Sequence, residues 1–180
     1  MIFTAAGRLI DKPNPKTDSF PLPNIDFVES QINTLFDQLK PTHLVCSGAC
    51  GADLLALKVA GKKNVTRIMV LPFLADEFKK TSVISRPGNW APLFDSIYIE
   101  SPKNGNVEIL GFKPDDPDAY QKTNLTIIDR AEQLSRKYSS PVTALIIWDQ
   151  KPRKNSDASA QFRELARSKG FDVRDVLTIQ

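Results

Sequence analysis

The chain has 180 residues, of which 41% are hydrophobic and 25% charged, and its formal net charge at pH 7 is +3. This length supports one hydrophobic core rather than two, so we expect a single domain over residues 1–180. The small net charge argues against a general nucleic-acid binder, and no apolar run approaches the ~18 residues that a membrane span needs.

Cysteine and histidine are scarce in this sequence. The chain has two cysteines, Cys46 and Cys50, and one histidine, His43. Because a structural zinc site needs four such ligands, we expect no metal. The first residues lack the basic and apolar regions of a signal peptide, and the low cysteine count fits a reducing compartment. We therefore expect a cytoplasmic protein.

Strand and helix patterns alternate along the chain. Short apolar runs predict strands over residues 2–6, 43–46, 65–71, 97–99, 142–148 and 173–179. Helical spacing of apolar residues predicts helices over residues 28–39, 52–61, 75–81, 90–94, 118–138 and 158–169. Four prolines make residues 11–23 a stiff loop, and the polar composition of residues 102–117 predicts an exposed one.

Apolar strands that are each followed by a helix are typical of a parallel sheet covered on both faces. We therefore predict an α/β fold, with a doubly wound, mostly parallel sheet of Rossmann-like type. In such sheets, ligands bind at the carboxyl ends of the strands. The motifs at these ends are Gly7-Arg8, Ser47-Gly48-Ala49, Leu71-Pro72-Phe73 and Trp148-Asp149. The predicted topology gathers these motifs into one crevice.

Residues 44–57 form the most informative segment. They predict a buried strand, a turn of small residues and a helix that begins near Gly51 or Ala52. Small residues let a ligand approach the backbone, and the start of a helix offers N–H groups and a positive dipole end to an anion. The segment lacks the spacing of a GxGxxG motif or a P-loop. It is therefore either a phosphate or nucleotide site, or a tight strand-to-helix connection.

Five further residues each allow a structural and a ligand-binding interpretation. Arg8 is either a ligand for phosphate or carboxylate, or a surface arginine. Asp53 either caps the helix or faces a ribose hydroxyl or a base, because a carboxylate would repel an adjacent phosphate. Asn124 lies on an apolar helix face, where its amide needs backbone or ligand partners. Asp149 is a candidate polar contact, whereas Trp148 forms core or a wall of the crevice.

The sequence shows no catalytic set of the Ser/His/Asp type, because its single histidine lies at the start of a predicted strand. This favours binding over catalysis. A cationic segment with Lys151, Arg153 and Lys154 follows the strand over residues 142–148. It is either a solvated loop or a lid over an anionic ligand.

An ordered series of motifs covers nearly the whole chain. It consists of Gly7-Arg8 with Asp11; Ser19-Phe20-Pro21; residues 47–57; Leu71-Pro72-Phe73 with Glu77-Phe78 and Ser82-Val83; Trp90 with Phe94; Tyr120 with Asn124 and Ala131; and Trp148-Asp149. With this series the chain resembles the SLOG superfamily of Rossmann-like nucleotide-binding domains. The resemblance is to the branch found in bacterial signalling and defence proteins.

The resemblance implies a domain that recognises a nucleotide-derived signal and controls a fused or partner effector. Nucleotide-cleaving enzymes of the superfamily carry a Pro-Gly-Gly-x-Gly-Thr-x-x-Glu loop, and this chain has Leu55 where the glutamate would fall. Related domains also often carry a Gly-Gly-Thr-type turn after the last apolar strand. This chain has residues 155–160 there, and Ser159 is the candidate to replace that threonine as a phosphate donor.

The leading hypothesis is a sensor of a nucleotide-derived second messenger in antiviral or stress signalling, with an effector protein as partner. We expect a homo-oligomer, no membrane contact, and no cofactor beyond the nucleotide-derived ligand. One alternative is a nucleotide N-glycoside hydrolase or transferase with Asp53 or Asp149 as acid or nucleophile, and another is a single-stranded DNA-binding module. The candidate ligand-binding residues are Gly7, Arg8, Ser47, Gly48, Ala49, Asp53, Pro72, Phe73, Asn124, Trp148, Asp149 and Ser159.

Overall fold

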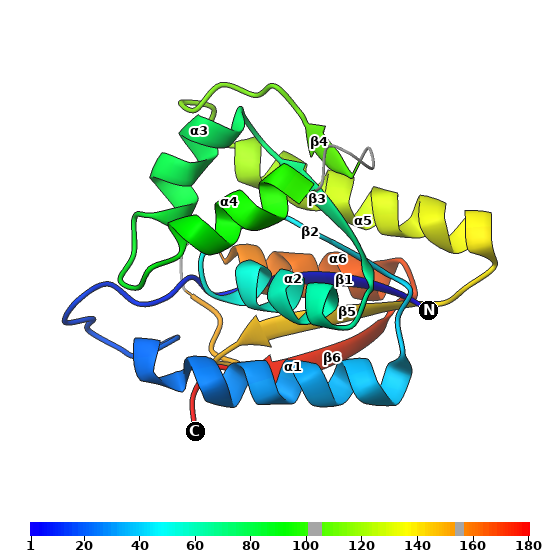
Figure 1. Ribbon diagram of the computed structural model, residues 1–180, viewed down its shortest axis with the longest axis horizontal. Helices are drawn as coiled ribbons and strands as arrows, with labels where there is room; N and C mark the ends of the chain where they lie inside the picture. Colours follow the sequence, from blue (N-terminus) through cyan, green and yellow to red (C-terminus); the bar gives the residue numbers. More distant parts are fainter. Residues whose placement is uncertain (101–105, 154–156) are drawn as a thin grey trace.

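The computed structural model describes residues 1–100, 106–153 and 157–180. Within these residues, six parallel strands form one sheet in the order β4-β3-β2-β1-β5-β6 (Figure 1). The strands are β1 (Ile2–Gly7), β2 (His43–Cys46), β3 (Thr66–Leu71), β4 (Val107–Ile109), β5 (Val142–Trp148) and β6 (Asp172–Leu177). The fold is therefore the predicted α/β, Rossmann-like sheet, and it is parallel throughout the described strands.

Helices cover both faces of the sheet. They are α1 (Ile25–Leu39), α2 (Ala52–Lys62), α3 (Ala75–Phe78), α4 (Ala91–Glu100), α5 (Ala119–Tyr138) and α6 (Ala158–Ser168). A 3-10 turn, η1 (Leu22–Asn24), precedes α1, and a π-helical turn, η2 (Lys79–Val83), continues α3. None of the helices in the described residues is long and apolar enough to cross a bilayer.

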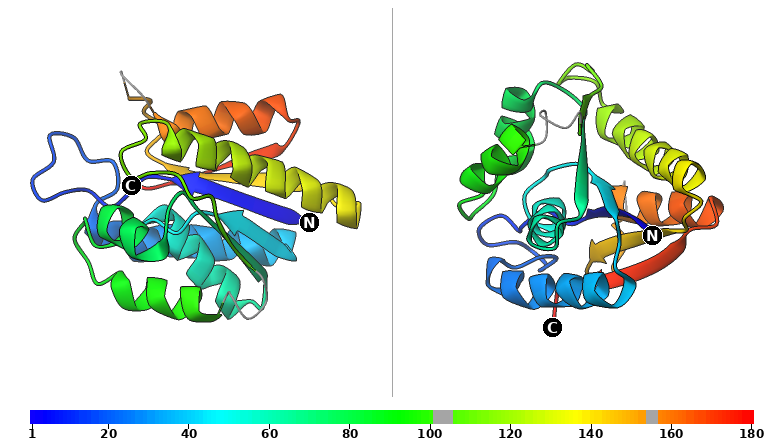
Figure 2. Two further views of the ribbon diagram at one scale, coloured as in Figure 1. Left: turned by 90° about the horizontal axis from the view of Figure 1, so that it is seen from above. Right: turned by 45° about the vertical axis from the view of Figure 1, so that its right-hand side comes forward.

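The two faces of the sheet carry separate hydrophobic clusters. Side chains alternate along a strand, so Phe3 of β1 belongs to a cluster with residues of α1, α2 and α4, whereas Ile2 belongs to a cluster with residues of α5 and α6. Figure 2 shows these two helical layers on opposite sides of the sheet. Every residue of β5 is buried. This explains why the central strands read as continuous apolar runs.

One predicted strand is wrong. Residues 97–99 belong to α4, and the edge strand β4 lies instead at Val107–Ile109, inside the segment predicted to be a loop. The isoleucines of 97–99 favour a strand locally. However, Phe94 and Ile97 are both buried at helical spacing, and the rings of Phe94 and Tyr98 stack 5.9 Å apart. Packing of this helix face thus overrides local propensity.

The carboxyl ends of the central strands meet at one edge of the sheet. Gly7 at the end of β1 pairs with Ile147 of β5, and Cys46 at the end of β2 pairs with Met69 of β3. The motifs predicted to share an edge therefore do share it. The loops after β1, β2, β3 and β5 form the surroundings of the site.

Candidate functional site

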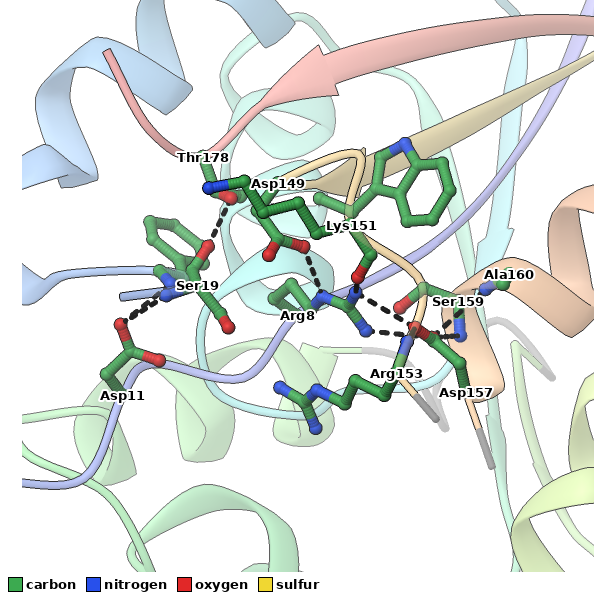
Figure 3. Close-up of polar contacts among 12 residues, drawn as sticks. Arg8, Asp11, Ser19, Asp149, Lys151, Arg153, Asp157, Ser159, Ala160 and Thr178 are labelled. Atoms are coloured by element: carbon green, nitrogen blue, oxygen red, sulfur yellow. Dashed lines mark hydrogen bonds and ion pairs between the residues drawn. The ribbon is translucent and has the colours of Figure 1, made fainter. Parts of the chain in front are cut away.

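Arg8 is the centre of a buried polar cluster between β1 and the chain after β5 (Figure 3). Its Nε donates to Oδ1 of Asp149 at 2.8 Å. Its Nη1 and Nη2 donate to the two carboxylate oxygens of Asp157 at 2.7 and 2.9 Å, and Nη2 also donates to the Lys151 carbonyl at 2.8 Å. All three guanidinium nitrogens of Arg8 are thus engaged within the chain, and we will call Arg8, Asp149 and Asp157 the arginine cluster.

Asp157 joins this cluster to the start of α6. Its carboxylate accepts hydrogen bonds from the N–H groups of Ser159 at 3.0 Å, Ala160 at 3.1 Å and Arg153 at 2.9 Å. Burial alone would raise the pKa of Asp157, but the hydrogen bonds from Arg8, Arg153 and Ala160 outweigh it and lower this pKa below its usual value. Asp157 is therefore an ionised N-cap that satisfies orphan donors of the helix.

Trp148 is a wall beside the arginine cluster. The guanidinium carbons of Arg8 and Arg163 lie 5.7 and 5.6 Å from the indole centroid, and Nε1 donates to Asp175 at 3.0 Å. Its exposed fraction is 5%. Trp148 therefore has its polar and aromatic contacts within the protein.

A cavity of about 380 Å³ lies over the ends of β1 and β2. The sequence-predicted residues that line this cavity are Gly7, Ser47, Ala49, Asp53, Asn124 and Ser159. They come from β1, from the turn after β2, from α2, α5 and α6. A larger hollow of about 900 Å³ at the amino ends of the strands is lined by none of the predicted residues. The 380 Å³ cavity is therefore the candidate site.

Polar side chains with unused hydrogen-bonding capacity face the cavity. In the described part of the chain, the side chains of Ser47, Asn124 and Ser159 make no hydrogen bond to another residue. The Tyr120 hydroxyl is shared with Ser82 Oγ at 2.8 Å. Binding sites typically combine such a few convergent polar groups with an apolar lining. These groups are available to a ligand.

Asp53 is the one acidic residue that lines the cavity within the described chain, and no lysine or arginine lines it there. Its Oδ2 accepts a hydrogen bond from the Ala49 N–H at 3.2 Å, and Oδ1 has no partner among the described residues. Burial raises the pKa of Asp53 to about 7, and the Ala49 hydrogen bond only partly opposes this. Near neutral pH this carboxyl can therefore both accept and donate.

The turn before α2 uses its backbone donors internally. The N–H groups of Ala49, Cys50 and Ala52 donate to Asp53, to the Ser82 carbonyl and to the Arg8 carbonyl. Gly51 has a φ of +91°, and a Cβ there would lie 2.8 Å from the Arg8 carbonyl oxygen. The close turn predicted from small residues is present, but these donors do not point to an external anion.

Three further predicted residues pack around the site without lining the cavity. A Cβ on Gly48 would lie 3.3 Å from Met69 and Phe94, so this glycine faces the core. Pro72 accepts a backbone hydrogen bond from Phe112 at 2.8 Å. The buried ring of Phe73 meets Tyr120 edge to face, 5.7 Å between centroids. These residues support the cavity wall.

Sequence reasoning missed several lining residues and one partner of Arg8. Thr81, Thr123 and Asp157 were not singled out, and Phe78, Ser82 and Tyr120 were quoted within the motif series but not chosen as ligand-binding residues. Tyr120 could have been chosen together with Asn124, because the two lie one helical turn apart on the same face of α5. Ser82 and Asp157 carry no such spacing signal, since only the tertiary fold places them. Lys154, Asn155 and Ser156, which the sequence analysis placed in a cationic loop and a phosphate turn, lie outside the described residues.

The motifs near the N-terminus fold against each other. Asp11 Oδ2 accepts hydrogen bonds from the N–H groups of Ser19 at 2.9 Å and Phe20 at 2.8 Å. This carboxylate closes the proline-rich loop that was predicted over residues 11–23. The two motifs therefore form one brace beside the arginine cluster (Figure 3).

Comparisons with known proteins are sparse. No protein-family model matches the chain, and no curated protein matches it in sequence. Among solved structures, the chain is similar to the X-ray structure of DNA processing protein A (DprA) from Streptococcus pneumoniae, with 14% sequence identity and a TM-score of 0.41. The similarity covers 98% of this chain and 58% of that chain. This chain thus corresponds to little more than half the length of that one.

Proposed function

We propose that the chain is a ligand-binding domain whose 380 Å³ cavity holds the base or nucleoside part of a nucleotide-derived molecule. One observation carries this proposal. The cavity at the carboxyl ends of β1 and β2 contains unpaired hydrogen-bonding side chains and an Asp53 carboxyl with a pKa of about 7, and no described cation lines it. Its volume lies within the roughly 300–1,000 Å³ of small-molecule sites.

The charge pattern favours a neutral heterocycle over a phosphate. A phosphate in this cavity would face the Asp53 carboxyl without an arginine or lysine to compensate it. A nucleobase instead presents neighbouring donors and acceptors, which Asp53, Ser47 and Asn124 can meet. The aromatic rings of Phe78 and Tyr120 supply apolar lining for its faces.

The resemblance to the SLOG superfamily supports a sensor role for this domain. In that role, the nucleotide-derived signal occupies the cavity and changes how the chain contacts an effector or a second copy of itself. Ligand binding can transmit a signal only if it favours one of two states of the protein. Because α5, α6 and the α3–η2 segment all contribute lining residues, a bound ligand would contact each of these elements and could shift their positions.

A thermal-shift screen tests the proposal. Wild type would be compared with Asn124→Leu, which replaces the cavity-facing amide by an apolar group of similar shape without removing a hydrogen bond of the described structure, and with Gln121→Leu, an exposed control on the same helix. The panel contains nucleosides, linear and cyclic nucleotides, NAD and ADP-ribose. A ligand at ~100 times its Kd adds about 2.7 kcal/mol, or roughly 5–10 °C in Tm. The shift should vanish in Asn124→Leu alone. A flat panel, or a shift that Asn124→Leu retains, would overturn the proposal.

A second candidate function is cleavage of an N-glycosidic bond with Asp53 as the acid or nucleophile. The pKa of Asp53 favours this activity, because a cavity-facing carboxyl with a pKa of about 7 can transfer a proton at neutral pH. Asp149, the other candidate for this role, is bound to Arg8. Sustained release of free base from AMP, NAD or deoxynucleotides, lost in Asp53→Asn, would establish this activity.

A further inference from the structure

The Asp157 carboxylate is held as a bound anion would be. Arg8 donates to it from two nitrogens, and the N–H groups of Arg153, Ser159 and Ala160 complete its shell, all within 3.1 Å (Figure 3). A guanidinium fork together with the first N–H groups of a helix is an arrangement that proteins use to bind phosphate. Here the chain itself supplies the anion. We will call this set of donors the anion cradle.

Charge keeps a second anion away from the cradle. The arginine cluster pairs one cation, Arg8, with two carboxylates, Asp149 and Asp157, so its formal charge is −1. The exposed fractions of Arg8 and Asp157 are 3% and 5%, so water screens the cluster weakly. A phosphate could bind Arg8 and the start of α6 only by displacing the Asp157 carboxylate.

The cradle adjoins the proposed ligand cavity. Ala158 and Ser159 line the cavity, and they directly follow Asp157 in the chain. At the start of α6 the N–H groups of Ser159 and Ala160 are already taken by Asp157, so a phosphate that reached it from the cavity would meet the Ser159 hydroxyl but neither of these two N–H donors. The Asp157 carboxylate therefore already fills the anion cradle when a ligand enters the cavity.

We propose that Asp157 is a specificity-determining residue whose carboxylate occupies the anion cradle and restricts the cavity to ligands without a phosphate at the α6 end, such as nucleosides. The ligand class rests on the proposed function. The cradle itself does not, because inorganic phosphate can probe it without any other ligand.

Chemical rescue tests the cradle. Asp157→Ser keeps an N-cap oxygen but frees space for an anion, and Asp157→Gly frees more. Both should melt below wild type in sodium chloride. Phosphate at about ten times its Kd should then raise their Tm by roughly 3–6 °C more than chloride of equal ionic strength, whereas wild type gains no such increment.

Two matched controls isolate the cradle. Asp157→Asn removes the charge but keeps the volume, so phosphate has no room. Asp149→Ala removes a carboxylate from Arg8 but leaves the cradle filled. Neither should show a phosphate-specific gain. The cradle is refuted if phosphate stabilises neither Asp157→Ser nor Asp157→Gly, or if it stabilises Asp149→Ala equally. It is also refuted if both Asp157 variants are unfolded and phosphate does not restore their folding.

Ligand preference tests the specificity claim. Wild type should bind adenosine more tightly than AMP in calorimetric titrations, and Asp157→Ser should shift this preference at least tenfold toward AMP. Equal wild-type affinities for the two would overturn the specificity claim and leave the proposed function standing. If wild type bound neither nucleosides nor nucleotides while the phosphate rescue succeeded, the proposed function and the specificity claim would fall together and the cradle would stand.

Discussion

Two neighbouring regions at the carboxyl edge of the sheet each bury an aspartate, and the two aspartates behave in opposite ways. In the arginine cluster, Arg8 and backbone N–H groups surround Asp157 and lower its pKa. In the cavity, Asp53 has one N–H partner and burial raises its pKa to about 7. Burial penalises both carboxylates, so their partners decide the outcome. The arginine cluster, in which Arg8 and Asp157 are fully paired, ties β1 to the chain after β5. Among its described residues, the cavity still has unpaired hydrogen-bonding groups that a ligand can use.

The largest expected effect on stability comes from breaking the arginine cluster. Arg8→Ala would leave Asp149 and Asp157 buried without their cation, which typically costs about 3–5 kcal/mol in the free energy of unfolding. Urea unfolding at pH 7 measures this loss. Arg8→Lys should recover only part of it, because an ammonium lacks the planar fork that binds both carboxylates. A loss below about 1 kcal/mol for Arg8→Ala would show that the cluster is not a structural tie.

The next effect concerns pH and Asp53. The pKa of Asp53 in the folded chain is about 7, whereas an unfolded aspartate titrates near 3.9. The folded state therefore holds more protons between these values, and the stability from this group is fully present below about pH 4 and lost as the pH rises to about 7. This loss is on the order of 4 kcal/mol.

Asp53→Asn should remove this dependence. The free energy of unfolding of Asp53→Asn minus that of wild type should rise from pH 4.5 to pH 8, by about 2–4 kcal/mol. Other titrating groups, including His43, are common to both proteins and cancel in the difference. Parallel stability curves across this pH range would mean that Asp53 titrates normally.

A smaller change should separate the two regions functionally. Asp149→Asn keeps an acceptor for the Arg8 Nε but removes a charge, so we expect a loss of about 1–2 kcal/mol in unfolding free energy. Ligand affinity should stay unchanged, since Asp149 is bound to Arg8 and does not line the cavity. If Asp149→Asn had wild-type stability but bound the ligand more weakly, Asp149 would belong to the ligand site, as the sequence suggested.

The smallest expected effect lies in the cavity wall. Tyr120→Phe removes the hydroxyl shared with Ser82, at a cost of about 0.5–1.5 kcal/mol in unfolding free energy. Because Tyr120 also lines the cavity, ligand affinity should fall as well. Calorimetric unfolding and a ligand titration on the same preparation check both. Unchanged affinity would remove the hydroxyl from the binding site.

The sequence was most informative where local chemistry determines structure. Buried parallel strands must be apolar on both faces, so β1, β2, β3 and β5 could be located and their ends brought to one edge. The small residues after β2 correctly predicted a close turn. Asn124 attracted attention because an amide on an apolar face needs a partner, and it does line the cavity.

Long-range pairing set the limit of the prediction. Arg8 and Asp157 are 149 residues apart, and no spacing rule links them. Ser82 reaches the cavity through a π-helical turn whose position depends on packing. Likewise, residues 97–99 favour a strand until α4 packs against the core. The sequence does not reveal which residue each polar side chain contacts in the fold. These contacts are what distinguish the arginine cluster, with its paired Arg8 and Asp157, from the cavity with its unpaired groups.

The most direct test of this division is an NMR titration of the wild-type protein with adenosine, guanosine, cytidine and uridine in turn. We predict that one nucleoside shifts amide resonances of residues that line the cavity, such as Ser47, Asp53 and Asn124, and leaves the side-chain Nε–H resonance of Arg8 and the amide resonance of Asp149 nearly unchanged. Shifts centred on the arginine cluster, or no shift with any nucleoside, would contradict the assignment of the cavity as the ligand site.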